Sequence, residues 1–435
     1  MLADVPTEWV AARFRDVMRL EDRREPIDPT RTYKLLGVRW YGNGAFLREH
    51  RVGEGLSAQH IYGVKPGDVI YNRLFAWKGS FGLIGEDLAG CFVSNEFPLF
   101  SALTDKIDPQ FLLRVLKHAR TSARADAFST GTTSISRNRL NEEDFLHFPI
   151  ALPPLAEQRS IAKTLNMIDA NIGKSREYLT ALNSAKMATM RELLTRGVRR
   201  STTPIQPLPA RWVLGRIAEG VTHNPADWKL VTLTKVAKLE SGHTPSREHP
   251  EYWGGNIPWL SLGDTNALDV LEVDQTAECI TVNGIANSSA RILPKDTVAF
   301  SRTATVGKAT RLKRPMATSQ DFANWICGPD LLPSYLVQVF RHMQREWLRL
   351  QEGSTHQTIY MPVFKRLQIL LPPIDEQKRI ADVGEAFDRR ITAERDALTV
   401  LIQNRTALAQ ELLSGRVRLP QVMIDHRRTT TAEAA

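Results

Sequence analysis

The stretch LPPLAEQRSIA at residues 152–162 returns almost unchanged as LPPIDEQKRIA at residues 371–381. The two copies begin 219 residues apart, the difference between 371 and 152, and the same offset carries Trp9 onto Trp228. Self-similarity at one fixed offset indicates an internal repeat. The chain of 435 residues is therefore predicted to be a duplication, in which each unit is a variable body followed by a tail that opens with the quoted stretch.

Each tail is predicted to form one long helix. A Pro-Pro pair suits a helix start, and Glu157 and Glu376 fall in the first turn, where a carboxylate complements the helix dipole. About forty residues then follow without proline, which at a rise of 1.5 Å per residue would give a helix about 57 Å long. A helix of this length exceeds what an ordinary globular core needs.

Apolar residues recur in both tails with the seven-residue period of a coiled coil, so the helices should pair with each other or each with a partner chain. Antiparallel pairing about a pseudo-two-fold axis would place Lys186 opposite Glu394, whereas one parallel arrangement would press Lys186 against the cation Arg405. We therefore expect the antiparallel arrangement. The expected seam residues are Leu179, Leu182, Lys186, Leu193, Phe387, Glu394, Leu398, Leu401 and Arg405.

Both bodies are predicted to be α/β domains with many strands. Runs such as GDVIYNRLFAW (residues 67–77) and DTVAFSRTATV (residues 296–306) are rich in β-branched and aromatic residues and are bounded by turn formers. The expected fold class is α/β: two globular bodies joined by two long antiparallel coiled-coil helices, with an internal pseudo-two-fold repeat. The predicted segments are residues 1–150 (first body), 151–199 (first long helix), 200–224 (linker), 225–369 (second body), 370–418 (second long helix) and 419–435 (a tail expected to be disordered).

Composition points to a polyanionic partner. The formal net charge of +9 and the sequence pI near 9.5 suit nucleic acid, although many soluble proteins are mildly basic. The three cysteines are too few and too far apart for a disulfide framework or a zinc cage. No apolar run reaches the roughly 18 residues that span a bilayer, and the N-terminus lacks a signal-peptide pattern. We expect a cytoplasmic protein that has no membrane partner.

Polar loops rich in Arg, Lys, Ser and Thr are the candidates for contact with DNA. TGTTSISRNRL (130–140) and EGSTHQTIYM (352–361) precede the two helices, while RLFAWKGSFG (73–82) and SRTATVGKATRLKR (301–314) lie earlier in each body. Arginine reads guanine edges, asparagine and glutamine read adenine, and serine, threonine and lysine bind phosphates. An ordinary solvated surface is the alternative interpretation. The candidate DNA-binding residues are Arg73, Lys78, Arg137, Asn138, Arg139, Arg302, Lys308, Arg311, Ser354, Thr355, His356 and Gln357.

Catalytic patterns are missing from the sequence. It has no dinucleotide-binding fingerprint, no HExxH and no GxSxG. The triplet GKS at residues 173–175 resembles the end of a phosphate-binding loop, but it lies inside the predicted heptad helix. We expect no catalytic residue, no metal and no cofactor in this chain, which favours a binding subunit whose chemistry is supplied by a partner.

With these features the chain resembles the DNA-specificity subunit of type I restriction-modification systems. The resemblance covers essentially the full length, because a variable body and a helix that opens with the Pro-Pro and Glu-Gln motif occur twice. VKPGDVIYNRLFAWKGSFG (64–82) and GHTPSREHPEYWGGNIPWLSLGD (242–264) look like patterns of the target-recognition domains of this family.

The resemblance implies that each body is a target-recognition domain that reads one half of an asymmetric, bipartite DNA site, and that the coiled coil sets the gap between the halves. It also implies two methyltransferase subunits that methylate adenine, and motor-nuclease subunits that join for cleavage. S-adenosylmethionine would bind to the methyltransferase subunits. The residues that match the repeated motif, and that would dock these subunits or else only cap and orient the helices, are Pro153, Pro154, Glu157, Gln158, Pro372, Pro373, Glu376 and Gln377.

Two other classes of protein compete with this interpretation. A self-contained restriction or modification enzyme would need catalytic motifs that the chain lacks. A coiled-coil adaptor that never touches DNA would share the repeat and the helices, but it would show no steep fall of DNA affinity with rising salt.

Overall fold

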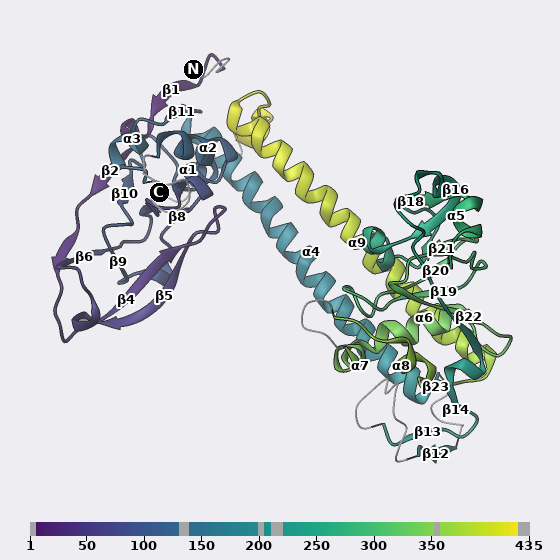
Figure 1. Cartoon of the computed structure of the whole chain (residues 1–435). Coiled ribbons are helices and arrows are strands. Elements are labelled where there is room, and N and C mark those ends of the chain that lie inside the picture. The colour runs from purple at the N-terminus through teal and green to yellow at the C-terminus, as the bar shows by residue number, and fades with distance from the viewer. Residues whose placement is uncertain (1–5, 130–138, 199–203, 210–220, 352–356, 425–435) are drawn as a thin grey trace. The chain divides into compact units, whose positions relative to one another are not determined.

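The computed structural model describes residues 6–129, 139–198, 204–209, 221–351 and 357–424. The chain forms two compact units (Figure 1): unit 1 consists of Met1–Gly173 and Thr399–Ala435, and unit 2 of Lys174–Leu398. Both boundaries fall within the long helices α4 (Leu155–Arg196) and α9 (Ile374–Ser414). Each unit therefore contains one α/β body and one part of each long helix.

The body of unit 1 is built on two antiparallel-rich sheets and three short helices. One sheet has the strand order β2-β10-β7-β8 and the other has the order β3-β6-β9-β4-β5, with β4 and β9 parallel. Helices α1 (Pro109–Leu116), α2 (Ala119–Phe128) and α3 (Glu142–Leu146) complete the body. The strands are β2 (Met18–Glu21), β3 (Arg24–Pro26), β4 (Thr32–Val38), β5 (Ala45–Val52), β6 (His60–Gly63), β7 (Val69–Tyr71), β8 (Phe81–Leu83), β9 (Phe92–Val93) and β10 (Leu99–Ala102).

Aromatic rings fill the core of this body. The ring centroid of Phe145 lies 4.7 Å from that of Tyr71 and 5.0 Å from that of Phe14. Phe81 and Phe100 pack on the same group, and all five side chains are buried. Burial of such side chains contributes about 1.5–3 kcal/mol each, so this cluster is a main source of the stability of the body.

The body of unit 2 has a related construction. Its five-stranded sheet has the order β15-β22-β19-β20-β17, and a three-stranded sheet has the order β18-β16-β21. The helices are α5 (Val282–Ala286), α6 (Pro333–His342), α7 (Gln344–Leu350) and α8 (Met361–Lys365), with a 3₁₀ segment η7 (Leu262–Asp269). The strands are β15 (Ala237–Ser241), β16 (Trp253–Leu260), β17 (Glu272–Val273), β18 (Glu278–Ile280), β19 (Val298–Ser301), β20 (Ala309–Leu312), β21 (Ala317–Thr318) and β22 (Phe322–Cys327).

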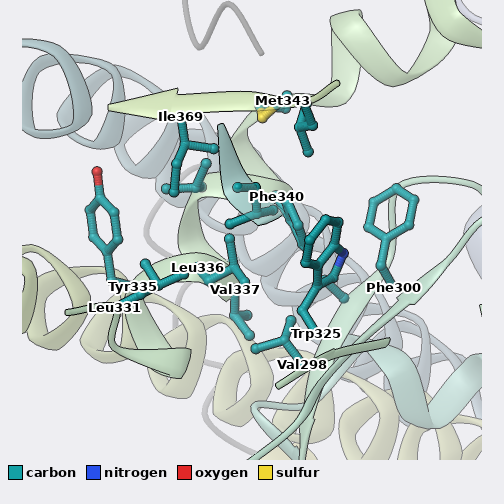
Figure 2. Close-up of a cluster of buried hydrophobic side chains, with 14 of the residues drawn as sticks. Val298, Phe300, Trp325, Leu331, Tyr335, Leu336, Val337, Phe340, Met343 and Ile369 are labelled. Atoms are coloured by element: carbon teal, nitrogen blue, oxygen red, sulfur yellow. The ribbon is translucent and has the colours of Figure 1, made fainter. Parts of the chain in front are cut away.

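The core of unit 2 lies where α6 packs on the larger sheet. Figure 2 shows Phe300 and Trp325 from the sheet beside Phe340 from α6, with Ile369 close by. The ring centroid of Phe340 is 5.2 Å from that of Phe300 and 6.3 Å from that of Trp325. Of the two tryptophans in the stretch 242–264, Trp259 is buried and Trp253 is half-buried.

The duplication extends to the strand register. In unit 1, β1 (Val10–Arg13) pairs antiparallel with β11 (Pro149–Leu152), and Val10 lies opposite Leu152. In unit 2, β14 (Lys229–Thr232) pairs with β23 (Gln368–Leu371), and Lys229 lies opposite Leu371. Both partners are displaced by 219 residues, so the sequence repeat is a repeat of structure. In each unit this strand pair joins the start of the body to the segment that enters the long helix.

The long helices pair antiparallel within each unit, and charged residues fix their register. In unit 1, Arg405 donates to Asp169 through Nε at 2.8 Å and Nη2 at 3.1 Å. In unit 2, Lys186 Nζ lies 2.5 Å from Asp388 Oδ1. The residue numbers of the partners add up to 574 in both pairs, and the offset of 219 converts one pair into the other. The pseudo-two-fold repeat therefore includes the ion pairs between the helices.

Each of these aspartates also holds a helix of its body. On α1, Arg114 pairs with Asp169; on α6, Arg341 Nη1 lies 3.0 Å from Asp388 Oδ2, to which Gln338 Nε2 also donates at 2.8 Å. Burial opposes ionisation of Asp169, but the hydrogen bonds from Arg405 and Arg114 outweigh it and lower its pKa. Body helix and helix pair are thus fastened at one carboxylate in each unit.

The predicted pairing of Lys186 with Glu394 is wrong, because Lys186 binds Asp388. Glu394 instead forms an ion pair with Arg390 on its own helix, at 2.6 Å. Heptad spacing defines the buried face but does not choose a charged partner, because long side chains reach carboxylates beyond the opposite seam position. Of the nine expected seam residues Leu193 is buried and the other eight are half-buried.

Segments outside the bodies also have structure. In the predicted linker, β12 (Ile205–Pro207) pairs with β13 (His223–Pro225), while residues 199–203 and 210–220 lie outside the described part of the chain. Of the tail predicted to be disordered, residues 419–424 have a defined place in unit 1: Ser160 Oγ in α4 donates to Met423 O at 3.3 Å, and Ile424 is buried. Residues 425–435 lie outside the described residues. Among the helices in the described ranges, none has the length and apolarity to cross a membrane.

The ion pairs of Asp388 should contribute far more to the free energy of unfolding than an exposed ion pair does. Its side chain and those of Lys186 and Arg341 are at most 14% exposed, so Asp388→Asn leaves two buried cations undercompensated and should lower the free energy of unfolding by about 3 kcal/mol. The matched control Asp274→Asn removes an exposed partner of Lys313 and should cost less than about 1 kcal/mol. Denaturant unfolding of the full chain measures both. Equal losses would show that the Asp388 pairs do not stabilise the helix pair.

Candidate nucleic-acid interface

The repeated Glu-Gln motif forms a junction between each body and its long helix. In unit 1, the buried carboxylate of Glu157 accepts from Trp9 Nε1 at 3.2 Å, and Arg418 donates to it from Nε at 2.9 Å and from Nη2 at 2.7 Å. Arg418 also donates to Glu8 at 2.7 Å, and these bonds raise the pKa of its guanidinium above the ordinary arginine value. The start of the first body is thereby tied to the first turn of α4.

Unit 2 repeats this junction. Glu376 accepts from Trp228 Nε1 at 3.0 Å and from the main-chain N–H of Val198 at 2.9 Å. Gly197 just before it has a φ of +73°, and a Cβ at this position would lie 2.3 Å from Glu376 Oε1. Only glycine lets the chain pass this close to the carboxylate in a left-handed conformation.

The glutamine of the motif holds the first helix of the body. Gln158 accepts from the N–H of Asp108, the N-cap of α1, at 2.8 Å and donates to Lys106 O and Pro153 O. Gln377 accepts from Leu332 N, the N-cap of α6, at 2.9 Å and donates to Asp330 O and Pro372 O. The amide therefore orients equivalent helices in the two units.

Most of the residues predicted to dock partner subunits are buried. Glu157, Gln158, Glu376 and Gln377 are at most 3% exposed, so their side chains cannot reach a partner from these positions. Their observed role is to cap and orient the helices, the alternative interpretation of the motif. Pro153 and Pro372 are buried as well, which leaves Pro154 and Pro373 as the exposed members of the predicted interface.

In unit 1 the structure brings together two of the predicted DNA-contact loops. Arg73, directly after β7, receives a hydrogen bond on its carbonyl from Leu140 N at 3.1 Å and donates its N–H to Glu96 O at 3.0 Å. The Arg73 side chain pairs with Glu142 and the Arg139 side chain pairs with Glu96. Loops that are 66 residues apart in sequence, from 73 to 139, thus meet at one place, where each arginine is paired with a glutamate.

Unit 2 builds the same arrangement with different side chains. Arg302, directly after β19, donates its N–H to Asp321 O at 2.9 Å and accepts from Ile359 N at 2.9 Å. Its guanidinium donates to the carbonyl oxygens of Gln320 at 2.9 Å and Ile359 at 3.3 Å. Burial lowers the pKa of this guanidinium, and Asp321 opposes that effect, so the side chain stays charged in a half-buried position. Carbonyl partners hold Arg302 in place without cancelling its charge.

The other candidate residues are placed as follows. Lys308 Nζ lies 3.0 Å from Asp269, and Arg311 lies between Glu272 at 2.8 Å and Glu385 at 3.1 Å. Gln357 is exposed and accepts from Ala304 N at 3.1 Å. Lys78 lies against aromatic rings. The candidates Arg137, Asn138, Ser354, Thr355 and His356 lie outside the described residues.

Two kinds of structural residue were not predicted. Asp169 and Asp388 were not assigned a role, although the offset of 219 places an aspartate at the same point of both tails. Trp9 and Trp228 also coincide in the repeat, but only the structure shows that their indoles bind the motif glutamates. Within the described ranges, no three His, Cys, Asp or Glu side chains are placed to hold a metal ion.

Comparison with known sequences assigns the fold to a class. Residues 6–182 and 225–402 both match the profile described as the type I restriction modification DNA specificity domain. Each match covers one body together with most of one long helix. The chain therefore belongs to the family of type I restriction-modification DNA specificity proteins.

Individual relatives agree with this assignment. The MjaVIII specificity subunit of Methanocaldococcus jannaschii is 21% identical over 430 residues, which cover 95% of this chain and 94% of that one. The HindI specificity subunit of Haemophilus influenzae is also 21% identical, over 92% of this chain and 99% of its own. The MjaIX specificity subunit of Methanocaldococcus jannaschii is 30% identical over 179 residues, 41% of each chain.

Solved structures support the fold. A chain from a study of assembly and conformational transition of the type I R-M system matches 95% of this chain and 100% of its own, with a TM-score of 0.60 and 18% identity. The S subunit of a type I restriction-modification system from M. genitalium matches 95% of this chain and 98% of its own, with a TM-score of 0.55 and 12% identity.

Removing the indole donor should weaken each junction. Trp9→Phe and Trp228→Phe keep an aromatic ring but leave a buried carboxylate short of one hydrogen bond, so each should lower the free energy of unfolding by about 1.5–3 kcal/mol. Trp40→Phe, at an exposed position, is the matched control and should change it by less than about 0.5 kcal/mol. Thermal unfolding of the three variants checks the ranking, which would be contradicted if all three changed alike.

A variant of Arg311 tests whether this residue stabilises the fold or binds DNA. Its charge is balanced by two carboxylates, so Arg311→Gln should lower the midpoint of thermal unfolding while leaving DNA affinity, measured well below that midpoint, within about twofold of the parent. Fluorescence anisotropy with labelled duplex at several salt concentrations measures the affinity. A salt dependence reduced by about one counterion would instead show that Arg311 binds a phosphate.

Proposed function

We propose that this chain is the DNA-recognition subunit of a type I restriction-modification complex, and that each body reads one half of an asymmetric, bipartite site in double-stranded DNA. Membership of the specificity family and full-length likeness to specificity subunits support the role. The formal net charge of +9 suits the phosphate backbone.

One observation supports the proposal that the two bodies read different half-sites. The two bodies share a skeleton and the same junction to the long helices, yet they present different side chains at the equivalent place. In unit 1 this place holds Arg73 and Arg139 paired with glutamates, whereas in unit 2 it holds Arg302 bound to carbonyl oxygens. Different side chains on one framework are what reading two different half-sites requires.

The chemistry of the complex is assigned to partner subunits. We place two methyltransferase subunits beside this chain, each binding S-adenosylmethionine and methylating an adenine in its half-site, and two motor-endonuclease subunits in the cleaving form. The exposed Pro154 and Pro373, at equivalent places in the two units, are the docking positions that the repeat offers to two identical partners. The complex acts on genomic DNA in the cytoplasm.

Exchange of one body tests the proposal. Replacing residues 6–150 with the first body of another specificity subunit, chosen to keep a tryptophan at position 9, should change one half of the methylated motif and leave the other half unchanged. Modified-base sequencing of host genomes that carry the parental and the exchanged genes reads out both halves. Replacing residues 225–369 instead is the matched control, which should change only the opposite half.

The same sequencing distinguishes the competing class. If deletion of the gene leaves adenine methylation unchanged while the partner methyltransferase is expressed, the chain is a coiled-coil adaptor and does not recognise DNA. A palindromic motif would contradict the reading of two different half-sites by two different bodies.

A further inference from the structure

The turn between β4 and β5 exposes two adjacent aromatic side chains in unit 1. Trp40 is 39% exposed and Tyr41 is 76% exposed, the highest value among the exposed large hydrophobic side chains in the described ranges. Aromatic side chains gathered at a surface mark contact sites, because they supply large contact area at a low cost in side-chain entropy. In Figure 1 these two strands form the long hairpin of the first body.

The main chain holds this turn in one conformation. Tyr41 N donates to Lys78 O at 2.8 Å and Gly42 N donates to Gly79 O at 2.7 Å. Tyr41 has a φ of +58°, a left-handed conformation that a tyrosine rarely adopts. Backbone strain of this kind persists where the surroundings enforce it and is concentrated at functional sites. The ring of Tyr41 is therefore presented to solvent by a rigid turn.

Two cations of this turn lie against aromatic rings, one of them on the exposed Trp40. Lys78 Nζ lies 3.8 Å from the ring centroid of Trp40 and 4.8 Å from that of Trp77. The Arg39 guanidinium lies 4.3 Å above the ring of Phe46. In the described part of the chain, no ion pair joins Lys78 or Arg39 to a carboxylate, in contrast to Arg73 and Arg139. The positive charge of this turn is thus available to a phosphate.

Unit 2 also places a cation on tryptophan rings, but that cation is ion-paired. The Arg247 guanidinium lies 3.6 Å from the ring centroid of Trp253 and 5.5 Å from that of Trp259, and Arg247 Nη1 lies 2.6 Å from Glu278 Oε1. The two bodies therefore offer different chemistry to a duplex.

We propose that the aromatic turn, residues 39–44 with Lys78, is the surface by which the first body reads its half-site. This inference rests on the proposed function and deepens it. The turn enters the major groove, which is wide enough for a two-stranded ribbon; Tyr41 packs against base edges, and Lys78 and Arg39 bind the flanking phosphates. Tyr41 is then a specificity-determining residue, and Lys78 supplies affinity independent of sequence.

The variant Tyr41→Gly should weaken DNA binding without destabilising the fold. Glycine adopts the left-handed conformation without strain, so this variant should unfold at the same temperature as the parent or higher. In the complex assembled with its methyltransferase subunits, it should bind the full site about tenfold or more weakly, because a good base contact is worth at least that factor. Tyr41→Phe keeps the ring and should bind within about threefold of the parent. Val52→Ala, exposed at the other end of the hairpin, is the control for general surface effects.

Three duplexes identify the half-site: the full motif, the motif with the first half scrambled, and the motif with the second half scrambled. Tyr41→Gly should lose affinity on the first and third duplexes and match the parent on the second. Lys78→Gln should weaken binding to all three and reduce the salt slope by about one. The proposal is overturned if the parent discriminates among the duplexes and both variants bind as the parent does. If the parental complex itself fails to discriminate, the proposed function fails instead.

Discussion

A buried carboxylate at the first turn of each long helix is the interaction on which the rest of the structure depends. Glu157 and Glu376 lie where the helix dipole favours negative charge, and each binds the indole that opens its body. The adjacent glutamine fixes the first helix of the same body. Because these contacts involve tryptophan and main-chain groups, the rest of each body is free to vary while its attachment to the helix stays constant.

The ion pairs between the long helices are a second constraint, and they too occur once in each unit. Asp169 and Asp388 each bind a cation on the neighbouring long helix and a donor on a body helix, and the two sites are related by the offset of the repeat. Register between the helices and orientation of the bodies are therefore coupled through the same carboxylates.

Much of the fold could be predicted from the repeat, but little of the site. Proline pairs, a long proline-free run and a heptad pattern are local signals, and α4 and α9 lie inside the predicted ranges. The charged partner of Lys186 could not be predicted, because α9 carries several acids and periodicity does not rank them. The charged loops were recognised, yet whether Arg73 or Arg311 already pairs with a glutamate depends on contacts between distant segments. Trp40 and Tyr41 were overlooked, since nothing local distinguishes an exposed aromatic residue from a buried one.

The position of Arg418 bears on the order in which the protein folds during synthesis. Unit 2 is a continuous segment, so all of its contacts can form once residue 398 has left the ribosome. Unit 1 is discontinuous, because Glu157 at the start of α4 binds Arg418, which lies 261 residues further along the chain. The half that is translated first is thus completed last, and until then the first body must persist with an unfinished junction, exposed to the chaperones and proteases that survey nascent chains.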